Sequence, residues 1–122
     1  MCAKELPKSK DVLSAAEKIK GFAVKTPLLR AQDLSEKLSA NIYIKPECLQ
    51  RVRAFKFRGA YNRLSRLSEE ERKRGVVAYS SGNHAQGVAA SAQILGMDAV
   101  IVMPHDSPKM KLQNTKDYGA EV

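Results

Sequence analysis

The second half of the chain alternates short apolar runs with helical patterns of hydrophobic residues. Two runs have the length of buried strands, residues 76–80 (VVAYS) and 98–104 (DAVIVMP). Each is followed by a helical pattern closed by a glycine, over residues 84–96 and 107–119. Residues 120–122 begin what we expect to be a third strand. This order predicts an α/β fold, an open parallel sheet with flanking helices and right-handed crossovers.

Local signals mark where these helices begin. Ser107 is the predicted N-cap of the last helix, with Pro108 at its first helical position. Ser68 and Glu71 form a capping box on a short helix that ends at Gly75. These signals place helix ends without reference to the rest of the fold.

The first half is less regular. A helix is predicted over residues 11–21, with Asp11 as its N-cap, and a short helix lies within residues 26–40. Residues 41–47 (NIYIKPE) alternate in polarity as a half-buried strand does, and a further helix is expected over residues 57–67. A sheet seldom stops at the first residues of a strand, so we interpret the chain as a fragment, with a small complete domain as the alternative.

Composition indicates a soluble globular protein, with 43% hydrophobic and 28% charged residues. The sequence contains no apolar run of membrane-spanning length and no secretory signal, which favours the cytoplasm. Cys2 and Cys48 make no disulfide framework, and with two histidines they offer no metal motif. We predict no metal and no membrane partner.

The net charge of +8 is concentrated before the regular α/β part. Residues 51–66 carry six cations and no acid, whereas residues 75–108 contain no lysine or arginine. A solvated helix face and an anion site are equally good interpretations of this cluster. Nucleic acid is not favoured, because the three phenylalanines and four tyrosines do not alternate with the cations as a stacking platform requires.

The turn over residues 80–83 joins a predicted strand to a predicted helix. In open parallel sheets, ligands bind at the carboxyl ends of strands, and a helix N-terminus favours a negative group. Gly82 lets the main chain approach a ligand closely. A ligand site here and a simple helix cap made by Ser81 or Asn83 both remain open.

Lys56 lies between Phe55 and Phe57 in the stretch AFKFRGAYN. Burial among apolar neighbours favours a neutral amine, which can condense with an aldehyde. The same tripeptide is more common in an edge strand or an amphipathic helix. We therefore expect a buried, nucleophilic lysine only if the surrounding sequence supports it.

The stretches KPECLQRVRAFKFRGAYN and SSGNHAQGVAASAQILGMDAVIVMP supply that support. Together they resemble the N-terminal part of the threonine dehydratase group of pyridoxal-phosphate enzymes, which includes serine dehydratases and serine racemases. The resemblance runs from residue 26 to residue 122 and implies the tryptophan-synthase-β-like fold. It implies that residues 1–66 belong to a larger cofactor-binding domain and residues 67–122 to a smaller, incomplete α/β domain.

The resemblance also implies roles for individual residues. Lys56 matches the lysine that holds pyridoxal 5'-phosphate as a Schiff base and moves the α-proton, and Phe55 matches the residue beside the cofactor ring. Asn83 matches the asparagine that hydrogen-bonds the phenolic oxygen of the cofactor. The loop that takes the substrate carboxylate is matched by Ser80, Ser81, Gly82, Asn83 and His84. Ser81 also matches the second acid–base residue of racemising members.

The implied activity is an ammonia-lyase that converts L-threonine, or L-serine, into a 2-oxo acid and ammonia. A serine racemase, a hydroxy-aspartate ammonia-lyase and a non-catalytic fragment are the alternatives. The implied partners are a small hydroxy amino acid and further copies of the protein, as a dimer or tetramer. Two features weaken the match: Arg53 and Ala54 stand where the group has Gly-Ser, and the group's phosphate loop lies downstream of residue 122. We expect this chain alone to have little or no activity.

Overall fold

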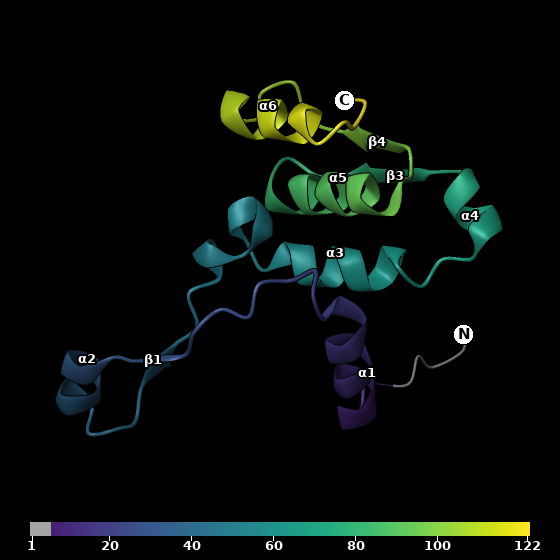
Figure 1. Cartoon of the computed structure of the whole chain (residues 1–122). Helices are drawn as coiled ribbons and strands as arrows, with labels where there is room; N and C mark the ends of the chain where they lie inside the picture. Colours follow the sequence, from purple (N-terminus) through teal and green to yellow (C-terminus); the bar gives the residue numbers. More distant parts are fainter. Residues whose placement is uncertain (1–5) are drawn as a thin grey trace.

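The computed structural model describes residues 6–122 and confirms an α/β fold (Figure 1). The α-helices are α1 (Ser9–Ile19), α2 (Gln32–Lys37), α3 (Lys56–Leu64), α4 (Glu69–Lys73), α5 (Asn83–Leu95) and α6 (Lys109–Asp117). The strands are β1 (Leu29–Arg30), β2 (Tyr43–Ile44), β3 (Val76–Tyr79) and β4 (Ala99–Val102). Two 3₁₀ helices, η1 (Glu47–Leu49) and η2 (Arg51–Arg53), precede α3.

The predicted parallel pairing is present. Strands β3 and β4 run parallel, in register from Val76 opposite Ala99 to Tyr79 opposite Val102. The expected third strand is a single parallel bridge between Val100 and Glu121. Helix α5 makes the crossover between the two strands, and α3 packs on its other side (Figure 1).

Helix α5 occupies the centre of the core because its side chains are small. Ala85, Ala89 and Ala92 are at most 1% exposed, and they pack in one cluster with Leu64 of α3 and Ile101 of β4. Small side chains let both a helix and a sheet approach α5 closely. Burial of the apolar face of α3 against this helix stabilises the pairing of the two.

A second cluster lies at the beginning of α3. Phe57 is fully buried and Tyr61 is 3% exposed. The ring of Phe22 stacks on that of Tyr61, with centroids 4.5 Å apart. This cluster anchors the segment before α3 to the rest of the chain.

The prediction that both runs of the parallel sheet are buried is wrong for one face. Val77 and Tyr79 are 73% and 72% exposed, and Val102 is 52% exposed. Successive residues of a strand point to opposite faces of the sheet, and α5 covers only one of them.

An antiparallel pair, β1 with β2, was not predicted from the sequence. Leu29 lies opposite Ile44 and Arg30 opposite Tyr43. The strand expected within residues 41–47 is therefore real, but both residues of β2 are exposed rather than half-buried. The alternation of residue types does not decide burial when only one neighbouring strand is present.

Two predicted N-caps are wrong. Asp11 is the third residue of α1, where its carboxylate accepts the N–H of residue 8 at 2.7 Å. Helix α6 begins after Pro108, and Ser107 lies one residue before the cap. The capping box of Ser68 and Glu71 is confirmed, with hydrogen bonds of 2.8 and 3.2 Å.

The predicted domain division at residue 66 stays a prediction. Helices α3 and α5, which lie on either side of it in the sequence, pack together.

Cys2 lies outside the described residues, and Cys48 is a free, exposed thiol. None of the helices among residues 6–122 combines the length and the apolar character that a membrane crossing requires. In the same range, no three His, Cys, Asp or Glu side chains are grouped so that they could hold a metal ion.

Candidate functional site

The loop after β3 presents polar side chains at the beginning of α5. The N–H of Ser80 donates to the carbonyl of Val102 at 3.1 Å, which continues the sheet, and the N–H of Gly82 donates to Ser80 Oγ at 3.3 Å. Gly82 occupies the N-cap position, and no side chain caps the helix. The simple capping role for Ser81 or Asn83 is therefore not what the structure shows.

Three of the predicted site residues in this region, Ser81, Asn83 and His84, are exposed. Their side chains lie beside main-chain N–H groups that an α-helix leaves without intrahelical partners. The helix dipole adds a partial positive charge at the same place. The loop thus has the donors and the polarity to bind a carboxylate.

Lys56 is the first residue of α3, and its predicted burial is wrong in this structure. Its side chain is exposed, as is that of Phe55 at 59%, whereas Phe57 is fully buried. Neighbouring residues of a helix point about 100° apart, so the two phenylalanines do not enclose the lysine between them. Nζ lies 5.2 Å from the centroid of the Phe55 ring. No acid pairs with it among residues 6–122.

A glycine brings the main chain of Lys56 against α5, the helix that follows the polar loop. A Cβ atom added to Gly87 would lie only 3.2 Å from the carbonyl carbon of Lys56 and 3.3 Å from Phe57 N. Helix α5 therefore rests directly on the main chain of Lys56. Asn83 lies four residues before Gly87 on the same face of α5, about 6 Å along the helix axis. The main chain of Lys56 therefore lies about one turn of α5 from Asn83.

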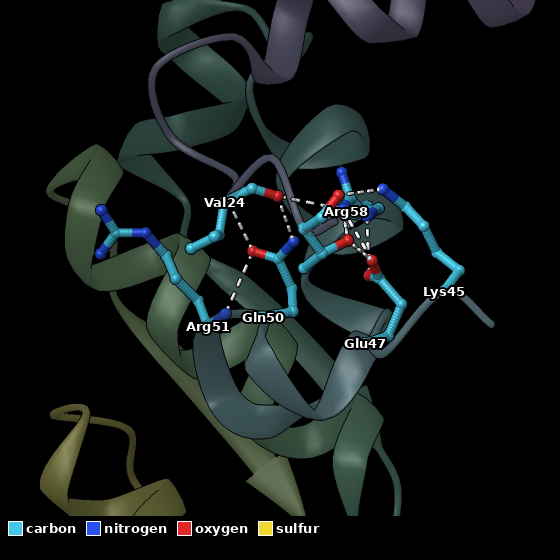
Figure 2. A network of polar contacts seen from close by, with 7 residues as sticks. Val24, Lys45, Glu47, Gln50, Arg51 and Arg58 are labelled. Atoms are coloured by element: carbon cyan, nitrogen blue, oxygen red, sulfur yellow. Dashed lines mark hydrogen bonds and ion pairs between the residues drawn. The ribbon is translucent and has the colours of Figure 1, made fainter. Parts of the chain in front are cut away.

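An ion pair secures the segment that precedes α3 (Figure 2). Arg58 donates to both oxygens of Glu47, from Nε at 2.7 Å and from Nη2 at 2.8 Å. The hydroxyl of Thr26 also donates to Glu47, at 2.7 Å, and Lys45 Nζ donates to the carbonyl of Thr26 at 2.6 Å. The hydrogen bond from Arg58 lowers the pKa of Glu47 to about 2, and the same contact raises the pKa of Arg58.

The amide of Gln50 completes this network. Gln50 is 3% exposed, accepts the N–H of Val24 at 2.8 Å and donates to the carbonyl of Val24 at 2.9 Å, as a neighbouring strand would. Arg51 Nε donates to the carbonyl of Phe22. Sequence reasoning missed these residues, because hydrophobic periodicity carries no signal for a buried polar side chain.

The turn just before Phe55 has unusual backbone angles. Val52 and Arg53 both have φ of 54°, in the left-handed region that β-branched and bulky residues disfavour. Arg53 is also the residue that departs from the glycine of the resembled group, and glycine adopts this conformation without strain. The departure therefore places backbone strain three residues before Lys56.

Comparisons with known proteins identify the family of this chain. A family model described as "Pyridoxal-phosphate dependent enzyme" matches residues 19–122. An L-threo-3-hydroxyaspartate ammonia-lyase from a Pseudomonas species is 54% identical over 112 residues, which are 92% of this chain and 35% of that protein. An L-threonine ammonia-lyase from Thermotoga maritima is 51% identical over 92% of this chain and 28% of its own length.

Among solved structures, a serine racemase from Dictyostelium discoideum superposes with a TM-score of 0.88 at 38% identity, over 93% of this chain and 37% of that one. The chain thus spans about a third of the length of the proteins it matches. The matches confirm the predicted group and its fold. The chain belongs to the family of pyridoxal-phosphate dependent enzymes.

Proposed function

We propose that this protein is an ammonia-lyase that removes the hydroxyl and amino groups of a small hydroxy amino acid, L-threonine first and L-serine second. The observation that supports the proposal is the contact of α5 with the main chain of Lys56, because the same helix begins at the loop suited to a carboxylate. The names of the relatives support a lyase or racemase acting on such substrates.

The residues present fit pyridoxal phosphate. An aldehyde cofactor requires a primary amine that it can reach, and the Lys56 side chain is exposed and makes no ion pair among residues 6–122. A planar pyridine ring requires an accessible apolar face, and the Phe55 ring is 59% exposed beside that amine. Asn83, at the first position of α5, offers an amide donor for the oxygen on the cofactor ring.

Each proposed residue then has a distinct task. Lys56 would hold the cofactor through Nζ, and the same amine, once the substrate amino group has displaced it, would accept the α-proton of the substrate. The cofactor, when bound, stores the electron pair that proton removal leaves on the α-carbon. Ser80, Ser81, Gly82, Asn83 and His84 bind the substrate carboxylate. The β-hydroxyl leaves as water, and one water is consumed again when ammonia is released, which gives the 2-oxo acid.

Hydroxyaspartate is the third candidate substrate, since the relative with 54% identity is an ammonia-lyase named for it. A serine racemase, with Ser81 as the second acid–base residue, is the alternative activity. A non-catalytic role, as a fragment or as a piece that assembles with another chain, is the alternative of a different class. A mass measurement of the native protein separates that alternative from the others. We further propose a homo-oligomer in the cytoplasm, with no nucleic-acid partner.

The test uses the protein expressed from its native gene. Ammonia release is measured with L-threonine, L-serine and L-threo-3-hydroxyaspartate, and borohydride reduction followed by peptide mapping locates the bound cofactor. We expect cofactor mass on the peptide containing Lys56 and no turnover in Lys56→Ala. Lys73→Ala, an exposed lysine of α4, serves as the control and should behave as wild type. Turnover that survives Lys56→Ala refutes the proposal.

A further inference from the structure

The end of the Lys111 side chain lies against Gly82, in the loop that the proposed function assigns to the substrate carboxylate. A Cβ atom on Gly82 would be 3.0 Å from Lys111 Nζ, 3.4 Å from Cδ and 3.7 Å from Cε. The lysine therefore packs across the space that a larger residue at position 82 would fill. Lys111 itself is partly buried.

A hydrogen bond joins α6, which carries Lys111, to α5. The Asn114 side-chain amide donates to Gln86 Oε1 at 3.2 Å, from α6 to the first turn of α5. Within α6 itself, the hydroxyl of Thr115, a fully buried residue, donates to the carbonyl of Lys111 at 2.7 Å. The lysine reaches the loop because β3 and β4 are parallel, which brings the segments that follow them to one edge of the sheet.

The charges at this position are unbalanced. Lys111 lies in the first turn of α6 and its ammonium lies at the N-cap of α5, so a cation is placed beside the positive ends of two helices. Neither helix has an acid in its first turn. No acidic side chain pairs with Lys111 in the part of the chain that the structure describes. An anion bound between the ammonium and the loop would remove this repulsion.

We propose that Lys111 is a substrate-binding residue, whose ammonium supplies the positive charge that holds the α-carboxylate of the amino acid in the 80–83 loop. The inference rests on the proposed function and extends it by one residue from a third element. The loop amides orient the carboxylate, and the lysine supplies the full charge that neutral donors lack. Because every candidate substrate carries an α-carboxylate, Lys111 contributes equally to the binding of all of them.

The first experiment compares Lys111→Met and Lys111→Arg with wild type in the protein expressed from its native gene. Loss of a charge-assisted hydrogen bond should raise KM about 10- to 100-fold in Lys111→Met while kcat changes little. The increase should be the same for threonine, serine and hydroxyaspartate, and Lys111→Arg should recover part of it. Lys116→Met, which removes an exposed charge from the same helix, is the matched control and should leave KM unchanged.

The second experiment measures binding without turnover. L-2-hydroxybutyrate has the carboxylate and carbon chain of threonine but no amino group, so it cannot react. Its dissociation constant, measured by calorimetry, should rise in Lys111→Met by the same factor as KM. The unfolding temperature without ligand should not fall, because Lys111→Met removes an unfavourable charge, whereas a purely structural lysine would lower it.

Several outcomes overturn the inference. They are an unchanged dissociation constant in Lys111→Met, an equal loss in Lys116→Met, a loss confined to hydroxyaspartate, and tighter Lys111-dependent binding of inorganic phosphate than of L-2-hydroxybutyrate. The proposed function fails separately. Suppose that L-2-hydroxybutyrate binds in a Lys111-dependent way while turnover survives Lys56→Ala. This result would support the carboxylate site and would contradict the proposed role of Lys56.

Discussion

The ion pair between Glu47 and Arg58 should make the stability of this chain depend on pH in a defined window. The two side chains are 18% and 29% exposed, and Arg58 donates to both carboxylate oxygens. The perturbations are acidification, which protonates Glu47, and the substitution Glu47→Gln, which removes its charge at every pH. Both leave the guanidinium of Arg58 without its anion.

The magnitude follows from the pKa of Glu47, which the hydrogen bond from Arg58 lowers from 4.5 to about 2. A fall of that size is equivalent to roughly 3 kcal/mol of folding free energy. Solvent screening at a partly exposed pair reduces this value, and we expect about 1–2 kcal/mol. Because the folded pKa lies below the unfolded one, the stabilisation is complete above about pH 4.5 and is lost as the pH falls to about 2.

The assay is urea unfolding of wild type and Glu47→Gln at intervals from about pH 7 to about pH 2. The difference in unfolding free energy should be about 1–2 kcal/mol at neutral pH and should approach zero at the acid end. Glu70→Gln is the matched control, because the carboxylate of Glu70 is exposed and makes no hydrogen bond or ion pair among residues 6–122. A difference that stays constant down to about pH 2, or one that Glu70→Gln reproduces, refutes the reasoning.

Two further predictions concern the backbone around Lys56. Gly87→Val should lower the free energy of unfolding by about 1–3 kcal/mol, because its side chain would overpack against the main chain of Lys56. Gly59→Ala, in open space within α3, should raise it by about 0.5–1 kcal/mol. Urea unfolding tests both variants, and an unchanged stability of Gly87→Val contradicts the close contact. Arg53→Gly should stabilise the chain by up to about 1 kcal/mol, because glycine adopts the left-handed backbone at this position without strain. Arg63→Gly, in a regular helix, should destabilise the chain by about 1 kcal/mol. A lower unfolding temperature in both variants contradicts the strain at Arg53.

The sequence predicted the second half of the fold well because its signals are local. The helical pattern over residues 84–96 depends on neighbouring residues alone, and Gly96 ends α5 with φ of 64°, as a C-terminal glycine does. The parallel pairing of β3 and β4 follows from the helix between them. The polar loop over residues 80–83 was found for the same reason, since the strand and the helix that flank it were both visible.

The features that the sequence did not predict depend on contacts between segments that are distant along the chain. Gln50 is buried because Val24 lies beside it, 26 residues away in the sequence, and no pattern around Gln50 records that neighbour. The exposure of Lys56 was missed because burial was inferred from adjacent residue types, whereas the helix turns Phe57 inward and the lysine outward. The position of Lys111 beside Gly82 likewise requires the sheet to be assembled.

The contact between α5 and α3 explains how rigid and adjustable parts can coexist at this site. Gly87 places main chain against the main chain of Lys56, and the buried Ser91 hydroxyl donates to the carbonyl of Gly87 at 2.7 Å, so its polar group is satisfied inside the core. A contact between two backbones has no rotamers to vary, so it fixes where the loop begins relative to the lysine. The side chains of Lys56 and Asn83 remain exposed and can still reorient around a ligand. Substitutions at position 87 should therefore shift the whole site, whereas substitutions at position 83 should change only the contacts of that one residue.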